Sequence, residues 1–399
     1  MQAQPERELS DDYYLTNFHA LTGFVSAIYS DILSAEEKRW YSNLSSSSDS
    51  AQRLYIRLLM RKKSVFRLSR LRYPEISCLV QASSELAEIG LACIHAPKSV
   101  DLLLGAFTKP ELVAKLDGVI SIPRASTIPR IKLIENILAV DESVLQRYLS
   151  MLRQDDKWIS PLGHGVWSVF RLCFFGNLYQ DSSEFVLRDL GTLRYENYPL
   201  DSASRVFMTR AQMDAHLRYF ECATLIDTID QKDADQLIAL TEIMPPPIDG
   251  DIHLQRRLDR LRNNIARQLE RLDRIDDALR LYTISVSPPA RERLVRIHLA
   301  SRQLDRAAKL VSSMVSQPFN DAELQVALRL QIKIDKAAGR KPAAGTRFRP
   351  ETSRLVLNPS EHRVELAAQN FAPVDWIFRH AFPDHSLHVQ KTQACHQAH

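Results

Sequence analysis

Glycine is scarce in this sequence, and its cysteines form no paired motif. Gly supplies 11 of the 399 residues, less than half of the usual share of about 7%. Nucleotide-binding α/β folds need glycine at several tight turns, so the sequence argues against such a fold. The five cysteines are odd in number and never spaced as C-x-x-C, which argues against a disulfide scaffold and a zinc ribbon.

Long apolar runs and a secretory signal are also missing. No run reaches the length of about 18 apolar residues that a membrane span needs. The N-terminus, MQAQPERELSDDYY, is polar and has no apolar core, so no secretory signal is expected and the expected location is the cytoplasm. The net charge is only +4, which means that any attraction to nucleic acid must come from local patches.

The spacing of apolar residues predicts a mainly α-helical chain. In residues 13–33 apolar side chains recur at intervals of three and four, as on one face of a helix. Thr108, Pro110 and Glu111 form the pattern of a capping box with proline in the first turn. Residues 158–220 are rich in aromatic side chains, which predicts a densely packed core segment.

A weak internal repeat begins after residue 251. Ile275 and Ala278 correspond to Leu304 and Ala307, and the offset is 29 residues. Two such copies predict a helical solenoid of the tetratricopeptide kind, although the usual period is about 34 residues.

One segment near the N-terminus is strongly basic and contains no acid. No Asp or Glu lies between Ala51 and Tyr73, so the like charges at i and i+4 on the predicted helix repel each other. An external polyanion such as a phosphate backbone would relieve this repulsion. The alternative is a solvated helix face whose acids come from elsewhere in the fold. The cations of this segment are Arg53, Arg57, Arg61, Lys62, Lys63, Arg67, Arg70 and Arg72.

A second cluster of arginines lies in residues 256–274, where acids are interleaved with the cations. Arg256 and Arg260 belong to this cluster, for which a salt-bridged face is as good an interpretation as a binding surface. Arg291 and Arg293 are better candidates for anion contact, because they open a predicted helix whose dipole favours anions.

Three segments resemble the bacterial Fanconi-associated nuclease family. They are YYLTNFHALTGFVSAIYSDIL, AQRLYIRLLMRKKSVFRLSRLRYPEI and RLCFFGNLYQDSSEFVLRDLGTLRYENYPL. The third is the most specific, with FFGNL-x-QD and FVLRDLG-x-x-RYE. The resemblance covers residues 12–340 and implies a mainly α fold.

The resemblance also implies a domain order. Members of the family combine a helical N-terminal region, a DNA-binding module of the SAP/winged-helix type and a tetratricopeptide-like helical repeat domain with a VRR-type nuclease domain. The expected parts here are an N-terminal helical region (1–48), a SAP/winged-helix-like module (49–120), a helical, aromatic-rich core (121–250), tetratricopeptide-like repeats (251–340), and a linker with a truncated or disordered tail (341–399).

Family members cut DNA near 5′ flaps in interstrand crosslink repair and use Mg²⁺ or Mn²⁺. Some bind the flap 5′-phosphate in a basic pocket of the helical domain. The matching region here starts at Arg256 and Arg260 and includes Arg291 and Arg293, with Glu292 in place of one cation. The implied partner is branched or 5′-flap DNA and no membrane, and a homodimer on DNA is left open. DNA binding implies that the cytoplasmic protein is associated with the nucleoid.

The nuclease signature of the family is incomplete in this sequence. The signature is an acidic residue, then Pro-Asp, then Glu-Val-Lys, and its carboxylates hold the divalent ion. Pro383-Asp384 is present, but no Glu-x-Lys follows it. We therefore expect the DNA-binding portion of a flap nuclease without its catalytic domain, with no catalytic residues, metal ligands or cofactor in this chain.

Two other hypotheses stay open at this point. One is a helical-repeat scaffold for protein interactions with no nucleic-acid role, and the other is an active nuclease with an unrecognised site. DNA affinity that falls steeply with salt separates the DNA-binding hypothesis from the scaffold. Mg²⁺-dependent cleavage of a 5′ flap would identify the active nuclease.

Overall fold

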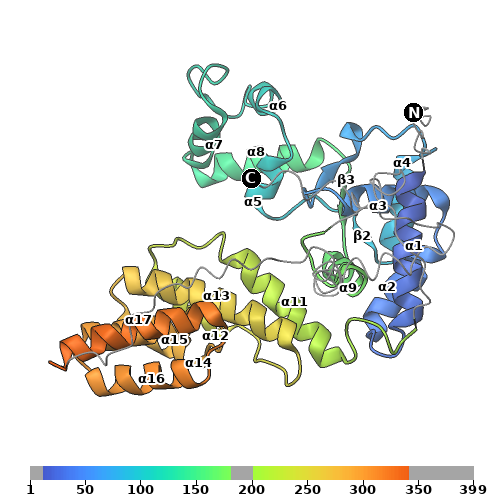
Figure 1. Ribbon diagram of the computed structural model, residues 1–399. Coiled ribbons are helices and arrows are strands. Elements are labelled where there is room, and N and C mark those ends of the chain that lie inside the picture. Colours follow the sequence, from blue (N-terminus) through green and yellow to red (C-terminus); the bar gives the residue numbers. More distant parts are fainter. Residues whose placement is uncertain (1–11, 181–200, 341–399) are drawn as a thin grey trace, which may run out of the picture. The chain divides into compact units, whose positions relative to one another are not determined.

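The computed structural model describes residues 12–180 and 201–340, which form a mainly α-helical protein (Figure 1). This confirms the predicted fold class. The chain divides into two compact units, and the division falls between Val206 and Phe207. Within the two described ranges, no helix is long and apolar enough to cross a bilayer.

Several predictions concern residues outside these ranges. The motif FVLRDLG-x-x-RYE begins at Phe185, the predicted tail spans 341–399, and Pro383-Asp384 lies within that tail. These three predictions therefore lie outside the described residues.

The first unit is built from nine described α-helices and three short strands. Ser48 begins the third helix by accepting a hydrogen bond from the Ala51 N–H. Thr108 and Glu111 form the capping box that the sequence predicts. The elements are α1 (Tyr13–Ile28), α2 (Ala35–Ser45), α3 (Asp49–Leu59), β1 (Phe66–Arg67), the 3-10 helix η1 (Leu68–Arg70), α4 (Leu79–Glu88), β2 (Ala92–Cys93), α5 (Val100–Gly105), α6 (Lys109–Ala114), α7 (Arg130–Leu138), α8 (Glu142–Gln154), β3 (Trp158–Pro161) and α9 (His164–Phe175).

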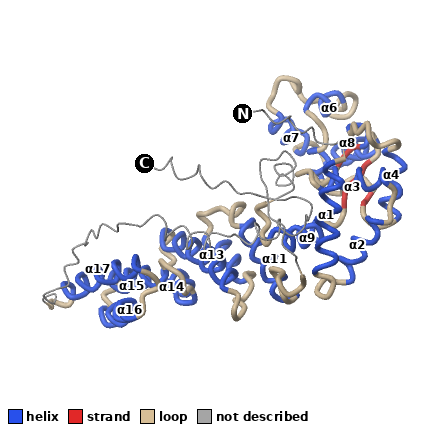
Figure 2. Tube along the Cα trace, turned by 45° about the vertical axis from the view of Figure 1, so that its right-hand side comes forward, coloured by secondary structure: helices blue, strands red, loops and turns tan. Residues whose placement is uncertain are grey.

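The three strands form one antiparallel sheet in the order β1-β3-β2. Arg67 pairs with Trp158, and Cys93 pairs with Ser160. The sheet packs against α3 and α4, as Figure 2 shows with the strands in red. Helices α5 to α8 therefore form an insertion between two strands that are neighbours in the sheet.

The inserted helices have a hydrophobic core of their own. Leu103, Leu112, Leu133 and Leu149 are buried together in one cluster. The predicted boundary between residues 120 and 121 falls inside this cluster. The other predicted domain boundaries stay predictions.

Aromatic side chains fill the core beside α9, as the sequence predicts for the first part of residues 158–220. Phe18 stacks on Trp167 with ring centroids 4.8 Å apart, and Trp40 packs against Phe170 at 5.0 Å. The Trp40 indole N–H donates a hydrogen bond of 2.7 Å to the Tyr55 hydroxyl. These contacts join α1, α2, α3 and α9 around one aromatic core.

Gly163, at the start of α9, approaches this core so closely that no side chain fits. Its φ is +86°, and a Cβ atom would lie 2.6 Å from Trp40 Nε1 and 2.9 Å from Tyr55 Oη. Both partners are buried and hydrogen-bonded to each other, so neither has room to move. Glycine is therefore required at this position.

Gly163→Ala should destabilise the protein by about 2 kcal/mol or more, because it combines a left-handed backbone with a steric clash. Urea denaturation followed by circular dichroism measures the change. Gly165→Ala is the matched control, since a Cβ atom there meets nothing within 4 Å. Gly165 lies inside α9, so this variant should be neutral or stabilise by about 0.5–1 kcal/mol. Equal effects of the two variants would contradict the steric argument.

The second unit consists of seven described α-helices. From α13 to α17, each helix packs against the next helix in the chain (Figure 1). They are α11 (Arg210–Leu225), α12 (Ala234–Glu242), α13 (Ile252–Arg271), α14 (Ile275–Ile284), α15 (Ala290–Ala300), α16 (Leu304–Ser316) and α17 (Asp321–Ala337).

The internal repeat is present in the backbone itself. Helices α14 and α16 begin 29 residues apart, and Ala278 and Ala307 are both fully buried. The turns before these helices also match, because Asp273 and Arg302 both have positive φ, at 60° and 57°. The structure confirms two equivalent helix-turn-helix pairs at the predicted offset, and the tetratricopeptide assignment itself stays a prediction.

Candidate nucleic-acid interface

The basic segment on α3 has acidic partners that are remote in sequence. Arg53 Nε and Nη2 each donate a hydrogen bond of 3.0 Å to a different oxygen of Asp12. Arg57 Nη2 lies 2.9 Å from Glu75 Oε1, and its guanidinium lies 4.1 Å from the centre of the Tyr14 ring. The inference that these cations lack an acid is therefore wrong, because the chain brings carboxylates from outside residues 51–73.

Arg67 is the most deeply engaged cation of the segment. Its side chain is only 7% exposed, and it meets three carboxylates: Glu111 at 2.7 Å, Asp156 at 3.1 Å and Asp155 at 3.4 Å. The guanidinium also lies 4.0 Å from the centre of the Phe107 ring. Arg67 therefore joins β1 to the inserted helices and is not available to a ligand.

Arg70 and Lys115 complete this ionic cluster. Arg70 Nε donates a hydrogen bond of 3.0 Å to Glu111, and Lys115 pairs with Asp155. Burial opposes the ionisation of Glu111, but hydrogen bonds from the Thr108 N–H and from Arg70 and Arg67 hold its pKa well below the usual value. The three cations of the cluster thus balance its three carboxylates, and the charge of Arg70 is engaged within the protein.

A different subset of the segment is exposed and without acidic partners. Among residues 12–180 and 201–340, no carboxylate lies within ion-pair distance of these side chains. The Arg61 guanidinium lies over the rings of Phe66 and Tyr73, at 5.9 Å and 5.4 Å from the ring centres. The Arg61 side chain is nevertheless exposed to solvent. We call this subset the exposed cation group, and it consists of Arg61, Lys62, Lys63 and Arg72.

Helix α4 contrasts with this group. Its sequence, LVQASSELAE, contains neither Lys nor Arg and has two glutamates. Glu85 is engaged, since its carboxylate accepts hydrogen bonds from the Ser48 N–H and hydroxyl. The exposed cations of this region therefore lie in the segments directly after α3 and η1, and α4 carries none.

Helix α13 carries a second set of cations, and its acids Asp259 and Glu270 form their ion pairs with Arg262 and Arg293. Asp259 is fully buried and accepts hydrogen bonds from the Ser287 N–H at 3.0 Å and the Ser287 hydroxyl at 2.8 Å. Glu270 is held by Arg293 and by the Tyr282 hydroxyl at 2.6 Å. The acids that are interleaved in the sequence are thus separated from the exposed cations in the structure.

The exposed face of α13 is consequently a row of arginines. At about 100° per residue, the four positions lie within about 60° of arc, and they span about 22 Å along the helix axis. Within the described ranges no carboxylate forms an ion pair with any of them. The α13 row consists of Arg256, Arg260, Arg267 and Arg271. A helical-wheel projection of the sequence is the signal that finds this row.

Arg291 and Arg293 contact anions that belong to the protein itself. Arg291 Nε donates a hydrogen bond of 3.0 Å to Glu323, and Arg293 Nε donates one of 2.9 Å to Glu270. Burial opposes the ionisation of Glu270, but its bonds to Arg293 and Tyr282 hold its pKa below the usual value. The sequence predicts that these two arginines are better candidates for anion contact than Arg256 and Arg260. This prediction is wrong, because their charges are already paired with carboxylates of the protein.

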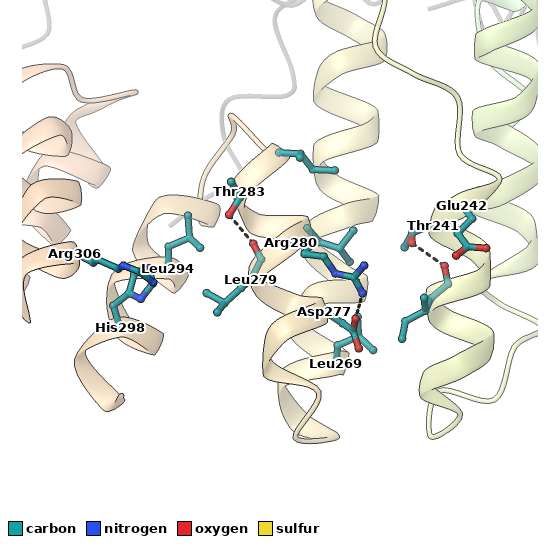
Figure 3. Close-up of a pocket in the computed structure, with 13 residues that line it drawn as sticks. Thr241, Glu242, Leu269, Asp277, Leu279, Arg280, Thr283, Leu294, His298 and Arg306 are labelled. Carbon is teal, nitrogen blue, oxygen red and sulfur yellow. Dashed lines mark hydrogen bonds and ion pairs between the residues drawn. The ribbon is translucent and has the colours of Figure 1, made fainter. Parts of the chain in front are cut away.

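A hollow of about 650 Å³ lies among α12, α14 and α15 in the second unit (Figure 3). Leu269, Leu279 and Leu294 contribute to its mainly apolar lining, and Arg280 pairs with Asp277 at its wall. None of the cations predicted to bind DNA lines this hollow. In the part of the chain that the structure describes, no three His, Cys, Asp or Glu side chains gather as a metal site would require.

Comparison with known proteins assigns the first helices to a recognised domain. Residues 12–93, from α1 to β2, match the family model described as the HTH domain of FAN1. A Fanconi-associated nuclease 1 homolog of Pseudomonas aeruginosa is 29% identical over 353 residues, which cover 86% of this chain and 60% of that relative. The homolog of Oryza sativa subsp. japonica is 30% identical over 237 residues, covering 56% of this chain and 24% of the relative.

Two solved structures share the fold. The crystal structure of paFAN1 bound to 2nt 5′-flap DNA with a gap matches with a TM-score of 0.73 and 27% identity, over 86% of this chain and 62% of that chain. The complex with 1nt 5′-flap DNA matches with a TM-score of 0.67 and 28% identity, over 83% and 60%. The chain thus spans about three fifths of the bacterial relatives that it matches.

These findings define a helical protein with an N-terminal helix-turn-helix domain. The chain is thus similar to Fanconi-associated nuclease 1 homologs over most of its own length, and its residues 12–93 match the HTH domain of that family.

Proposed function

We propose that this chain binds branched DNA, as the DNA-binding portion of a 5′-flap nuclease of interstrand crosslink repair. The observation that carries the proposal is the likeness to two solved chains that are bound to gapped 5′-flap DNA. Identity of 27–28% over more than four fifths of this chain supports a shared binding role as well as a shared fold.

The charges of the first unit support the same proposal. Arg61, Lys62 and Lys63 are consecutive, exposed and without acidic partners in the described ranges. Each phosphate that such a cation neutralises releases counterions from the DNA, and this release favours binding. The exposed cation group is therefore the part of the predicted interface that we assign to phosphate contact.

The composition of α4 supports binding that does not depend on base sequence. In base-reading helix-turn-helix proteins the second helix lies in the major groove, and Arg or Lys commonly contacts guanine there. Helix α4 packs on α3 and is the helix that we take as the second one of the pair, and it has no cation to make such a contact. Contacts to phosphates fix position and orientation without reading bases, so the proposed recognition is of DNA structure.

The proposal assigns binding, and no cleavage, to residues 12–180 and 201–340. Mg²⁺ or Mn²⁺ is expected with the nuclease signature of the family, whose Glu-Val-Lys triplet this sequence lacks. Binding through guanidinium and ammonium groups needs no metal ion. The homodimer on DNA and the nucleoid location stay predictions.

Binding to a labelled, gapped 5′-flap DNA in the presence of EDTA tests the proposal. Fluorescence anisotropy at about 50 mM salt should give a dissociation constant in the nanomolar-to-micromolar range, because electrostatic contacts dominate there. An unbranched duplex of equal length is the control and should bind more weakly. No binding to either DNA would favour the protein-interaction scaffold, and cleavage of the flap on addition of Mg²⁺ would contradict the assignment of binding alone.

A further inference from the structure

The hollow of about 650 Å³ in the second unit has a mainly apolar lining. Leu269 from α13, Leu281 from α14 and Leu294 from α15 are buried and contribute to it. Ile284, at the end of α14, also lines the hollow and is 54% exposed. Covering apolar surface in a concave site is favourable, so the hollow is suited to a ligand that carries apolar groups.

The threonine hydroxyls at the hollow already have acceptors within the protein. Thr241 Oγ1 donates a hydrogen bond of 2.7 Å to the Ile238 carbonyl oxygen, and Thr283 Oγ1 donates one of 2.7 Å to the Leu279 carbonyl oxygen. Each bond lies within the helix of the threonine itself, as Figure 3 shows with dashed lines. These hydroxyl protons are therefore not free for a ligand, and the lining keeps its apolar character.

The charges in the middle of the hollow are balanced by the protein itself. Asp277 accepts a hydrogen bond of 2.8 Å from Arg274 Nε and also pairs with Arg280. The hydrogen bonds from Arg280 and Arg274 hold the pKa of Asp277 below its usual value, so this carboxylate stays ionised and paired. The middle of the hollow therefore presents no acid that needs a cation from a ligand.

The two ends of the hollow differ, because they carry charges of opposite sign without a protein partner. Arg306 of α16 donates a hydrogen bond of 3.1 Å to the neutral Gln303 side chain, and Glu242 is the last residue of α12. In residues 12–180 and 201–340, no ion pair involves either side chain. Figure 3 shows Arg306 and His298 at one end and Glu242 at the other. A complementary ligand thus has an acidic group and a basic group on opposite sides of its apolar part.

We propose that this hollow binds a short peptide segment of a partner protein, in which apolar side chains lie between an acidic residue and a basic residue. The acidic residue of the segment contacts Arg306, and the basic residue contacts Glu242. The volume lies within the range of about 300–1,000 Å³ that is typical of ligand sites. Stacked helix pairs, such as those of the 29-residue repeat, commonly present their surfaces to other proteins. This inference does not depend on the proposed DNA binding.

The test uses fluorescein-labelled peptides that share one apolar centre and differ in their end charges. They are EELILLKK, EELILLEE and KKLILLKK, and EESGSSKK is the control without apolar side chains. Each is titrated with the full chain and followed by fluorescence anisotropy. Wild type should bind EELILLKK with a dissociation constant on the order of 10–100 µM. It should bind the other two apolar peptides about fivefold more weakly, because one end of each meets a like charge, and EESGSSKK should not bind.

Charge reversal at either end of the hollow should change which peptide binds best. R306E makes both ends acidic and should bind KKLILLKK about fivefold more tightly than EELILLKK. E242K makes both ends basic and should prefer EELILLEE. The matched control is K309E, which reverses an exposed cation of α16 that does not line the hollow, and it should keep the wild-type order. All three positions are exposed, so thermal unfolding of the variants should coincide with that of wild type.

Three outcomes would overturn the proposal. The first is no binding of EELILLKK to wild type, and the second is equal affinity for the three apolar peptides, which would indicate non-specific adhesion. The third is a dimer of the chain that R306E converts to a monomer in analytical ultracentrifugation, because the occupant would then be a second copy of the chain. Flap-DNA binding is measured on the same wild-type protein, so a failure of the peptide site leaves the proposed function standing.

Discussion

Replacing Arg67 by methionine should lower the free energy of unfolding by about 3–5 kcal/mol. Arg67 is the only cation that contacts all three of Glu111, Asp155 and Asp156 in the described structure. Methionine retains much of the apolar stem but leaves the three carboxylates with two cations. Removing one member of a buried ionic cluster costs more than the cluster itself contributes, because the remaining charges stay desolvated.

Arg72→Met is the control for this prediction. Arg72 is exposed and donates hydrogen bonds only to the Ser69 and Leu71 carbonyl oxygens, so its loss should cost less than about 1 kcal/mol. Urea denaturation measures both variants. A cost below about 1 kcal/mol for Arg67→Met would show that the cluster does not hold the inserted helices against the sheet.

The same cluster gives the wild-type protein an acid-sensitive contribution to stability. The pKa of Glu111 is lowered in the folded state, so this contribution is complete above the unfolded pKa of about 4.3 and is lost as the pH falls below it. In Arg67→Met the pKa of Glu111 should be less depressed. The free energy of unfolding of this variant should therefore fall less steeply than that of wild type below about pH 4.

R61Q/K62Q/K63Q should bind the gapped 5′-flap DNA on the order of a hundredfold more weakly than wild type at 100 mM salt. Each cation that neutralises a phosphate contributes about 0.9 log units per log unit of salt, and three such contacts are removed. The effect should be the same for flaps of unrelated sequence, because these contacts carry no base information. Anisotropy titration measures the dissociation constants.

The matched control is K309Q/R329Q/K333Q, which removes three exposed cations from α16 and α17. Its affinity should stay within about threefold of wild type, since it changes the net charge without touching the exposed cation group. Arg67→Met should also keep its affinity while it is folded, because Arg67 is buried. Equal losses in the two triple variants would show that net charge alone attracts the DNA.

The helical class and the repeat could be predicted because both depend on local periodicity. The 29-residue offset places Ala278 and Ala307 at equivalent buried positions, and the matching turns at Asp273 and Arg302 follow from the same register. The insertion of α5 to α8 could not be predicted in this way. It depends on the pairing of Cys93 with Ser160, which are far apart in the chain and lie in strands too short to show a pattern.

The ion pairs of the candidate site could not be predicted from the sequence either, because they also depend on residues that are far apart in the chain. Counting acids within residues 51–73 indicated unpaired cations, but Asp12, Glu111 and Asp156 reach this segment from other parts of the chain. The count in α13 left a salt-bridged face and a binding surface equally open, but Asp259 and Glu270 point inward. Local charge counts ignore which face a residue occupies and what folds against it.

The most direct test of the account is the salt dependence of DNA binding by the unmodified chain. The exposed cation group predicts that log K falls linearly with log salt, with a slope of about −3.6 from four phosphates at about 0.9 each. The result should be the same with EDTA present. A flat dependence would contradict the claim that exposed, unpaired cations hold the DNA backbone.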